Sequence, residues 1–413
     1  MVVDMATKTK EASRSLAALP TAVKNMVLLE TAEMLMKECP YIQSENEKDL
    51  VAGKEKGLSA AMLDRLELGD KGICSMVAGL REVAALPDPV GEVADMKRLP
   101  SGITVGRMRI PLGVVGMIYE SRPNVTIDAA ALCLKAGNGV FLRGGSEAIH
   151  SNLALAKIFH IVLESFDVDP AVVQVIPVTD REAVNHMIAL EGLLDVIIPR
   201  GGEGLIRFVA ENSRVPVLKH YKGVCHAYVD EEADIDMAVR IVLNGKTQRP
   251  GVCNALEGLL VHRDIAGAFL PVVAEQLVAE GVELRGCGRS CSLVPAMVPA
   301  SEEDWGTEFL DLILSVKVVD SMEEAQEHIA RYGSQHTETI ITKSYSRSRR
   351  FLREVDASAV MVNASTRFND GGQFGLGAEI GISTTKLHAY GPMGLEELTT
   401  RKFIVYGDGE VRE

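Results

Sequence analysis

One cysteine has neighbours that suit nucleophilic chemistry. Cys253 follows a turn-forming pair, Pro250 and Gly251, and two cations, Lys246 and Arg249, lie just upstream. The thiolate is the reactive form of cysteine, and nearby cations stabilise it by lowering the thiol pKa. Such a thiolate can attack an acyl carbon. The alternative is a buried structural cysteine, because free cysteine is among the most buried residue types.

A glycine-containing turn suits the binding of a phosphate group. Arg200, Gly201 and Gly202 follow a predicted strand at residues 195–198 and precede a predicted helix at 204–211. A glycine turn that opens a helix presents backbone N–H groups, which bind phosphate. The spacing differs from the GxGxxG dinucleotide motif, so an ordinary strand-to-helix turn stays an alternative.

A second turn of this kind carries a cation and a hydroxyl. Arg143 ends a short apolar run that begins at Gly139, and Gly144 and Ser146 follow it. A guanidinium and a hydroxyl at the end of a strand can hold a ribose or its 2′-phosphate. We therefore expect this turn to contribute to a nucleotide site. The glycine-rich segment 375–381 is similar to a dinucleotide fingerprint, but no strong strand leads into it, which favours an active-site loop.

Arg122 and Asn124 follow a predicted strand at 113–119. An Asn amide at the carboxyl end of a strand can donate a hydrogen bond to a developing oxyanion. The alternative is that this Asn only stabilises the turn, which is the more common role of an Asn in a turn.

The elements that must position these residues alternate between strand and helix. Continuous apolar strands with helices between them are typical of a parallel sheet covered on both faces. Ligands in such domains bind at the carboxyl ends of the strands. The predicted strands are 104–110, 113–119, 139–143, 172–176, 195–198, 259–261, 312–319, 339–342, 359–363 and 402–406. The predicted helices are 21–37, 62–66, 73–86, 127–136, 148–163, 181–190, 204–211, 323–330 and 346–355.

Length and composition indicate a globular protein of two or three domains. The chain has 413 residues, 47% of them hydrophobic, and a net charge of −14, which argues against nucleic acid or an anionic membrane as the main partner. No apolar run approaches the ~20 residues of a membrane span, and the N-terminus lacks the apolar core of a signal peptide. Seven irregularly spaced cysteines argue against a disulfide framework and favour a cytoplasmic protein. No zinc-finger or HExxH spacing occurs, so we predict no metal site.

Taken in order, these segments resemble the aldehyde dehydrogenase superfamily. Residues 111–116 resemble the family's strand into the Asn-bearing turn, and 136–140 resemble its segment before the cofactor strand. Cys253 matches the family nucleophile, and Glu308 falls where the family has a ribose-binding Glu. The likeness is greatest to the members that reduce L-glutamyl 5-phosphate in proline biosynthesis. The segments that carry this closer likeness are 119–126, 246–254, 325–340, 374–381 and 391–395.

Two positions depart from that pattern. Gln326 stands where an aliphatic residue is usual, and we interpret it as a change on a helix surface. Tyr390 stands where an Arg is usual, which removes a cation near the subunit-contact tail and bears on assembly or on a phosphate contact.

The resemblance implies an α/β, aldehyde dehydrogenase-like fold with two doubly wound domains and a small β oligomerisation element. The implied NADPH-binding domain spans residues 1–96 and 113–248, and the catalytic domain spans 249–385. Residues 97–112 and 386–413 would form the oligomerisation element, which pairs the strand near 104–110 with the C-terminal tail. A homo-oligomer, dimer or tetramer, is therefore expected.

The resemblance also implies NADPH-dependent reduction of L-glutamyl 5-phosphate to L-glutamate 5-semialdehyde and phosphate, through a thioester on Cys253. Asn124 and the Cys253 backbone N–H would stabilise the oxyanion. Functional coupling to a glutamate 5-kinase is expected, because the acyl phosphate is labile. The residues expected to bind the substrate are Arg122, Lys246, Arg249, Ser365 and Arg367. Those expected to bind the cofactor are Arg143, Gly144, Ser146, Arg200, Gly201, Gly202 and Glu308.

One further comparison within the superfamily favours a reductase. Hydrolytic members carry a Glu that activates water against the thioester, and the corresponding segment here, 217–223, holds two lysines and His220 but no carboxylate. Ser146, where NAD-preferring members often have a Glu, favours NADPH, although Glu147 lies next to it. Two alternatives stay open: a hydrolytic aldehyde dehydrogenase for another small aldehyde, and a non-catalytic protein that keeps the fold for binding or assembly.

Overall fold

The computed structural model describes residues 1–412, apart from the side chain of Ala61, and divides the chain into two compact units. Unit 1 comprises Met1–Lys219, Gly375–Gly381 and the chain from Met393 onward, and unit 2 comprises His220–Phe374 and Ile382–Pro392. Both units are α/β with a parallel sheet, as the sequence predicts.

Unit 1 is built on a four-stranded parallel sheet with the strand order β5-β4-β3-β6. All four strands were expected, because β3 and β4 are wholly buried apolar runs. The strands and helices of the unit up to residue 219 are α1 (Val2–Leu16), α2 (Thr21–Lys37), α3 (Cys39–Glu55), α4 (Ala60–Leu66), α5 (Asp70–Ala85), β1 (Val93–Arg98), β2 (Thr104–Pro111), β3 (Val114–Tyr119), α6 (Asn124–Lys135), β4 (Gly139–Arg143), η1 (Ser146–Ala148), α7 (Ile149–Ser165), η2 (Pro170–Val172), β5 (Val173–Val175), α8 (Glu182–Ile188), β6 (Val196–Arg200) and α9 (Glu203–Asn212).

The first helix, α1, is absent from the predicted elements. It buries positions at helical spacing, but three of them are Ala6, Thr9 and Ser13, which carry little or no apolar surface. A stripe of small residues gives a weak amphipathic signal, so periodicity alone does not detect this helix.

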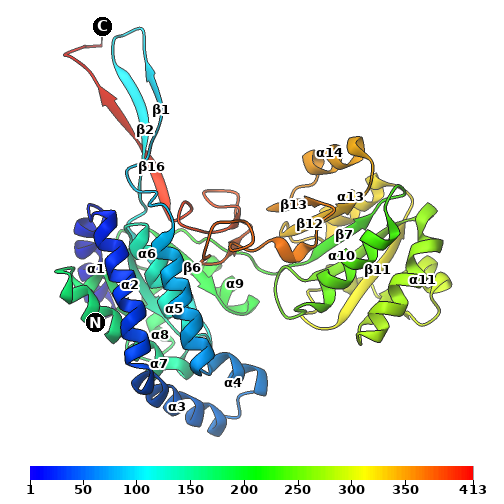
Figure 1. Cartoon of the computed structure of the whole chain (residues 1–413), viewed down its shortest axis with the longest axis horizontal. Helices are drawn as coiled ribbons and strands as arrows, with labels where there is room; N and C mark the ends of the chain where they lie inside the picture. Colours follow the sequence, from blue (N-terminus) through cyan, green and yellow to red (C-terminus); the bar gives the residue numbers. More distant parts are fainter. Residues whose placement is uncertain (413) are drawn as a thin grey trace. The chain divides into compact units, whose positions relative to one another are not determined.

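Three strands form an arm on unit 1. The final strand, β16 (Thr399–Tyr406), pairs antiparallel with β2, from Thr399 opposite Pro111 to Tyr406 opposite Thr104. β1 pairs antiparallel with the other edge of β2. The arm projects from the body of unit 1 (Figure 1). The predicted pairing of residues 104–110 with the C-terminal tail is thus confirmed.

Unit 2 is built on a seven-stranded parallel sheet with the order β10-β9-β11-β8-β7-β12-β13. The boundary near residue 220 differs from the expected one at 249, because β7 and α10 pack into this sheet. The elements of the unit are β7 (Cys225–Val229), α10 (Ile235–Thr247), β8 (Leu256–His262), α11 (Arg263–Ala279), β9 (Glu283–Gly286), α12 (Gly288–Leu293), β10 (Val298–Pro299), η3 (Glu303–Gly306), β11 (Ile313–Val319), α13 (Met322–Tyr332), β12 (Thr337–Ile341), α14 (Tyr345–Glu354), β13 (Ala359–Val362), η4 (Thr366–Phe368), β14 (Ile382–Ser383) and β15 (Gly391–Pro392).

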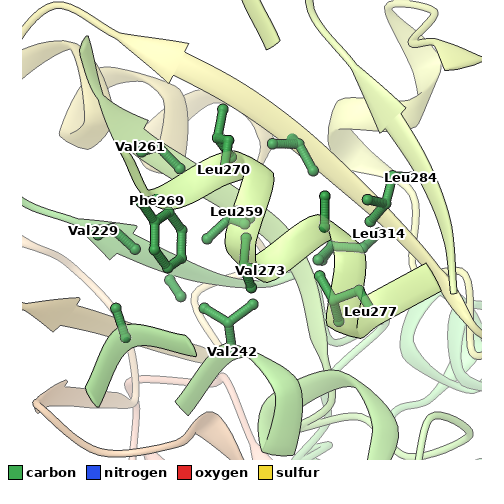
Figure 2. Close-up of a cluster of buried hydrophobic side chains, with 14 of the residues drawn as sticks. Val229, Val242, Leu259, Val261, Phe269, Leu270, Val273, Leu277, Leu284 and Leu314 are labelled. Atoms are coloured by element: carbon green, nitrogen blue, oxygen red, sulfur yellow. The ribbon is translucent and has the colours of Figure 1, made fainter. Parts of the chain in front are cut away.

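Two apolar clusters cover the two faces of this sheet. On one face, residues of α10 and α11 such as Val242 and Phe269 pack against the central strands, as Figure 2 shows. On the other face, Ile329 of α13 and Phe351 of α14 pack against Tyr228 and its neighbours. Full burial of a side chain of this size stabilises the fold by roughly 1.5 to 3 kcal/mol. The sheet is therefore a rigid support for the loops at its edges.

Within residues 1–412, no helix has both the length and the apolar character that a membrane span needs.

Candidate functional site

Cys253 lies in the turn that joins α10 to β8 in unit 2. The helix is well defined at its start, where the Asp234 carboxylate accepts a hydrogen bond from the Met237 N–H at 3.0 Å. It ends at Thr247, before the Pro250–Gly251 pair, which cannot continue a helix. Cys253 is partly buried, so its thiol is sheltered from bulk water but reachable.

The Cys253 turn is held by close backbone contacts. A Cβ on Gly223 would overlap the Cys253 carbonyl oxygen and lie 2.9 Å from its Cα, so only glycine fits there. The Cys225 thiol donates to the same carbonyl at 3.2 Å. Burial raises the pKa of Cys225 well above its usual value, which keeps it protonated as a donor. On the other side, Asn254 Nδ2 donates to the Asn369 carbonyl at 2.9 Å. These contacts fix the position of the nucleophile.

Two histidines stand beside the Cys253 thiol. One nitrogen of His220, one nitrogen of His336 and Cys253 Sγ all lie within 4.8 Å of one another. The two imidazole rings meet edge to face with centroids 5.5 Å apart. Burial, with a smaller effect of His220, lowers the pKa of His336 to about 3, so this imidazole is neutral at physiological pH. The cluster therefore places the neutral imidazole of His336 near a thiol.

All three groups lie at the amino edge of the seven-stranded sheet. Cys253 precedes β8, His336 immediately precedes β12, and His220 precedes β7. These three strands are neighbours in the order β8-β7-β12. Neither histidine is among the site residues expected from the sequence, because ligands of α/β domains are expected at the carboxyl ends of the strands. The available signal was a histidine three residues before the predicted strand 339–342, at position 336.

Two of the expected substrate residues add positive charge near the thiol. Arg367 follows the N-cap residue Ser365 of η4, and its Nε donates to Gln248 Oε1 at 2.9 Å. Burial and the charge of Arg249 lower the pKa of Arg367, while the charge of Cys253 acts in the opposite direction. Arg367 is thus within electrostatic range of both Arg249 and Cys253, and the activation of the thiol stays a prediction.

Lys246 lies elsewhere, in the core of unit 2. Its side chain is fully buried, and Nζ donates to Glu257 Oε2 at 2.6 Å. Glu257 also accepts from the Leu310 N–H at 3.2 Å, and burial raises its pKa. The expectation of a substrate contact at Lys246 therefore needs correction: the apolar face of α10 carries its ammonium group inward, to a buried carboxylate on β8.

Glu308, expected at the cofactor ribose, lies close to the Cys253 turn within unit 2. Its Oε1 accepts a hydrogen bond from the Gly223 N–H at 2.9 Å. Because Gly223 contacts the Cys253 carbonyl, Glu308 supports the backbone beside the nucleophile in this conformation.

Asn124 and Arg122 lie in unit 1, at the start of α6. Asn124 is the first residue of the helix, and its Nδ2 donates to Asp128 Oδ2 at 2.9 Å. Burial raises the pKa of Asp128 to about 6. Arg122 lies in the preceding turn with its side chain exposed. The turn that follows β3 thus presents an amide and a guanidinium at a strand's carboxyl end, as predicted.

The turn after β4 holds the expected cofactor residues Arg143, Gly144 and Ser146. The Arg143 guanidinium donates to the carbonyl groups of Gly144 and Thr179 at 2.9 and 3.1 Å, while its buried Nε has no hydrogen-bond partner. A Cβ on Gly144 would overlap Asn152 Nδ2, so a larger residue there would displace the Asn152 side chain. Ser146 is exposed at the start of η1. Glu147 is turned away, since its carboxylate accepts from the Ser121 N–H and hydroxyl at 2.7 and 2.6 Å.

The turn after β6 is occupied by a carboxylate. Gly202 is the N-cap of α9, and its N–H donates to Glu120 Oε2 at 3.0 Å. A Cβ on Gly201 would lie 2.7 Å from the same carboxylate. Arg200, just before the turn, packs its guanidinium against Gly381. A phosphate at this helix N-terminus would therefore have to replace the Glu120 carboxylate.

The two departures from the expected pattern both lie in unit 2. Gln326 is on the surface of α13, where Nε2 donates to Glu354 at 3.3 Å, in agreement with a helix-surface change. The Tyr390 hydroxyl donates to Asp356 at 3.4 Å, and burial raises its pKa to about 12. Lys386 also contacts this Asp, at 2.5 Å, so a cation remains next to Tyr390.

Comparison with known proteins assigns the chain to a family. The profile of the aldehyde dehydrogenase family matches residues 2–283. The chain therefore belongs to the aldehyde dehydrogenase family. A gamma-glutamyl phosphate reductase from Desulfotalea psychrophila is 63% identical over 411 residues, which cover all of this chain and 98% of the relative. Within the family, the chain falls among the gamma-glutamyl phosphate reductases.

Solved structures agree with this assignment. The crystal structure of the gamma-glutamyl phosphate reductase from Thermotoga maritima has a TM-score of 0.98 and 48% identity, and the match covers 100% of both chains. A glyceraldehyde-3-phosphate dehydrogenase from Methanocaldococcus jannaschii, solved with NADP, has a TM-score of 0.69 at 15% identity over 98% of this chain and 94% of its own. This second likeness is one of fold alone.

Proposed function

We propose that the protein reduces L-glutamyl 5-phosphate to L-glutamate 5-semialdehyde and phosphate, in the proline biosynthesis pathway, with NADPH as reductant. The observation that carries the proposal is the position of Cys253, partly buried in a tightly held turn beside two imidazoles and two guanidinium groups. The near full-length similarity to gamma-glutamyl phosphate reductases supports the choice of substrate.

In the proposed reaction, the Cys253 thiolate attacks the acyl carbon of the substrate. The C–O bond to phosphate breaks, phosphate leaves, and a thioester forms on Sγ. The Cys253 N–H and the Asn124 amide stabilise the oxyanion, as the family resemblance implies. Arg249, Arg367 and Arg122 bind the phosphate and the carboxylate of the substrate, because guanidinium groups match both in geometry and charge.

The segment that carries a Glu in hydrolytic relatives holds His220 here, next to the thiol. In a neutral imidazole whose Nδ1–H donates to the Ile382 carbonyl at 2.8 Å, the other nitrogen is an acceptor. We assign His220 to proton transfer at the thiol and at the thiohemiacetal oxygen. Arginine side chains around the thioester hold anions and activate no water, which supports a reductase over a hydrolase.

The residues of unit 1 fit a phosphorylated dinucleotide. Arg143 has a buried Nε without a hydrogen-bond partner, and Ser146 is exposed beside it. Because the Glu147 carboxylate is engaged by Ser121, it does not oppose a 2′-phosphate at this turn. We propose that Arg143, Gly144 and Ser146 hold the adenosine ribose and its 2′-phosphate, and that Gly201 and Gly202 receive the pyrophosphate. When bound, NADPH supplies the hydride that reduces the thioester.

We further propose a homo-oligomeric, cytoplasmic enzyme that receives its labile substrate from a glutamate 5-kinase. The exposed apolar side chains of the arm formed by β1, β2 and β16 support an assembly surface there.

The reaction run in reverse tests the proposal. Pyrroline-5-carboxylate, which is in equilibrium with the semialdehyde, is mixed with NADP⁺ and the protein, with and without inorganic phosphate. NADPH formation that requires phosphate is the expected result. Turnover that ignores phosphate would mean that water accepts the acyl group, and the hydrolytic alternative would replace ours. An absence of turnover in both mixtures would favour a non-catalytic protein.

Cys253→Ala should lower kcat by roughly 10³-fold or more, because no other group can form the thioester. NADPH binding, followed by nucleotide fluorescence, should change less than about twofold, since every contact proposed for the 2′-phosphate lies in unit 1. Cys287→Ser is the matched control for loss of a thiol and should keep full activity. Residual turnover in Cys253→Ala close to that of the unmodified protein would remove Cys253 from the mechanism.

A further inference from the structure

The cluster of His220, Cys253 and His336 has the composition of a transition-metal site. Each residue offers one ligand atom, and the three atoms lie within 4.8 Å of one another. They come from three separate segments that meet at the amino edge of one sheet, on backbone that is tightly packed around Gly223. Cysteine sulfur and histidine nitrogen are both ligands that zinc binds in proteins.

Both imidazoles are oriented by a second hydrogen bond. His220 Nδ1 contacts the Ile382 carbonyl at 2.8 Å, and His336 Nδ1 contacts Thr337 Oγ1 at 2.7 Å. Thr337 Oγ1 in turn accepts from Asn369 Nδ2 at 2.8 Å. Metal-binding histidines show this arrangement, because a partner on one ring nitrogen fixes the tautomer and the direction of the other.

An orphaned nitrogen points to a missing ligand in the same cluster. His336 is completely buried, and its Nε2 has no hydrogen-bond partner within the described chain. A buried polar atom without a partner costs free energy unless a ligand or a water molecule satisfies it. Neither the nucleophilic attack nor the phosphate departure proposed above uses this atom, so it calls for a separate explanation.

We propose that Cys253, His220 and His336 form a reversible binding site for Zn²⁺ or a similar borderline-soft divalent cation, which blocks the nucleophile while it is bound. Zn²⁺ at tetrahedral bond lengths needs ligand atoms about 3.3 to 3.8 Å apart. Because the three atoms lie within 4.8 Å of one another, a contraction of at most about 1.5 Å brings them to these distances. A water molecule or a substrate oxygen would complete the coordination.

Binding is an acid–base exchange without electron transfer. The Cys253 S–H bond breaks, its proton passes to solvent, and the thiolate electron pair forms the Zn–S bond. That pair is then no longer available to attack an acyl carbon. The inhibitory consequence rests on the proposed function, whereas the metal site itself does not.

Cobalt(II) provides a direct test, because a thiolate ligand gives Co²⁺ an intense charge-transfer absorption. The full chain, freed of metal with a chelator, is titrated with Co²⁺, and Zn²⁺ is then added to displace it. We expect one Co²⁺ per chain with a thiolate band that disappears in Cys253→Ser. Affinity should fall roughly tenfold or more in His220→Asn and in His336→Gln. Alkylation of Cys253 by iodoacetamide should be slowed at saturating Zn²⁺ and restored by the chelator.

A second group of potential ligands supplies the control. Glu231, His262 and Asp264 also lie within 4.8 Å of one another but include no thiol. His262→Asn should therefore leave the thiolate band and the Zn²⁺ protection unchanged. If the buried His336→Gln variant does not fold, as judged by circular dichroism, His220→Asn alone decides the matter.

A thiolate band that is absent, or that persists undiminished in the histidine variants, would overturn the metal site. The measurement is independent of turnover. A positive Co²⁺ titration in a protein that fails the reverse reaction would support the site and refute the enzyme. An active enzyme without the band would do the opposite.

Discussion

At the scale of single residues, the placement of the nucleophile depends on the presence of a glycine at position 223. Gly223 lies against the carbonyl and the Cα of Cys253, and its own N–H donates to Glu308. The same carbonyl receives the Cys225 thiol. A change of one methyl group at position 223 must therefore move the turn that carries the thiol.

Gly223→Ala should lower kcat by roughly 10²-fold, because a misplacement of about 1 Å has an effect of this order on a positioned reaction. The measurement is the reverse-reaction rate together with the rate of Cys253 alkylation. Gly267→Ala is the matched control: this position in α11 has open space around it, and the substitution should stabilise the helix by about 0.5 to 1 kcal/mol without loss of rate. Equal rates in the two variants would contradict the proposed role of the close contact.

The buried ion pair between Lys246 and Glu257 should contribute to the stability of unit 2. Lys246→Met should destabilise unit 2 by about 3 kcal/mol, because it leaves a buried carboxylate without its cation. Trp305, the single tryptophan of the chain, lies in unit 2 and reports the loss in urea unfolding. The double variant Lys246→Met with Glu257→Gln should recover most of the lost free energy of unfolding. If Lys246→Met instead raises KM for phosphate with unchanged stability, Lys246 is a substrate residue after all.

At the scale of elements, the strands were largely predictable and the site was only partly so. β3, β4 and β6 are continuous apolar runs, which two-sided burial imposes on a parallel strand. β7 was missed because Cys225 and His226 begin it and mask a short apolar core. α1 was missed because it packs through small and polar side chains.

Cys253 could be recognised from its local sequence, whereas His220 and His336 could not be joined to it. Their proximity depends on the strand order β8-β7-β12, which no local pattern encodes. Lys246 shows the opposite case, in which a residue close to Cys253 in the sequence is not part of its surroundings. Lys246 lies seven positions before the nucleophile in the sequence, but it belongs to helix α10, which directs its side chain into the core and onto Glu257.

Helix α13 makes unit 2 sensitive to acid. His328 packs against Trp305 and Tyr332, and burial, with the charges of His226, Lys317 and Arg331, lowers its pKa to about 3. Its pKa in an unfolded chain is about 6.5, so between these values the unfolded state binds the extra proton. Stability is therefore complete above pH 6.5 and falls as the pH is lowered.

From pH 7.5 to pH 5, His328 alone should remove on the order of 1 to 2 kcal/mol of unfolding free energy. Urea unfolding followed by Trp305 fluorescence at both pH values gives this difference. His328→Phe should show a smaller loss than the unmodified protein. Ile329→Val, a destabilising change on the same helix without a titrating group, should keep the original dependence. A loss of the same size in His328→Phe would assign the acid sensitivity to other groups.

At the scale of the whole molecule, the arm leaves apolar surface uncovered. Phe403, Val405 and Tyr406 of β16 are 66%, 57% and 61% exposed, and β16 pairs on one edge only. We expect another chain to cover this surface, since an open apolar edge otherwise promotes uncontrolled association.

Val405→Glu should therefore raise the dissociation constant of the homo-oligomer by roughly tenfold or more, because a charge would have to be buried in the contact. Sedimentation velocity over a range of concentrations measures this shift. Val278→Glu, on the exposed side of α11 in unit 2, introduces the same charge on an element outside the arm and should have no effect. A Val405→Glu protein that sediments like the original would place assembly elsewhere.

The pairing of β2 with β16 also sets an order of events during synthesis. Arg109 of β2 and Thr399, whose hydroxyl accepts from its guanidinium at 3.0 Å, are separated by 290 positions. At typical translation rates a ribosome needs roughly 15 to 60 s to add that length of chain. The main segment of unit 2 is contiguous and emerges within this interval, while β2 still lacks a neighbour on one edge. Only a chain translated to its last strand can complete the arm, so prematurely terminated products are excluded from any assembly that the arm mediates.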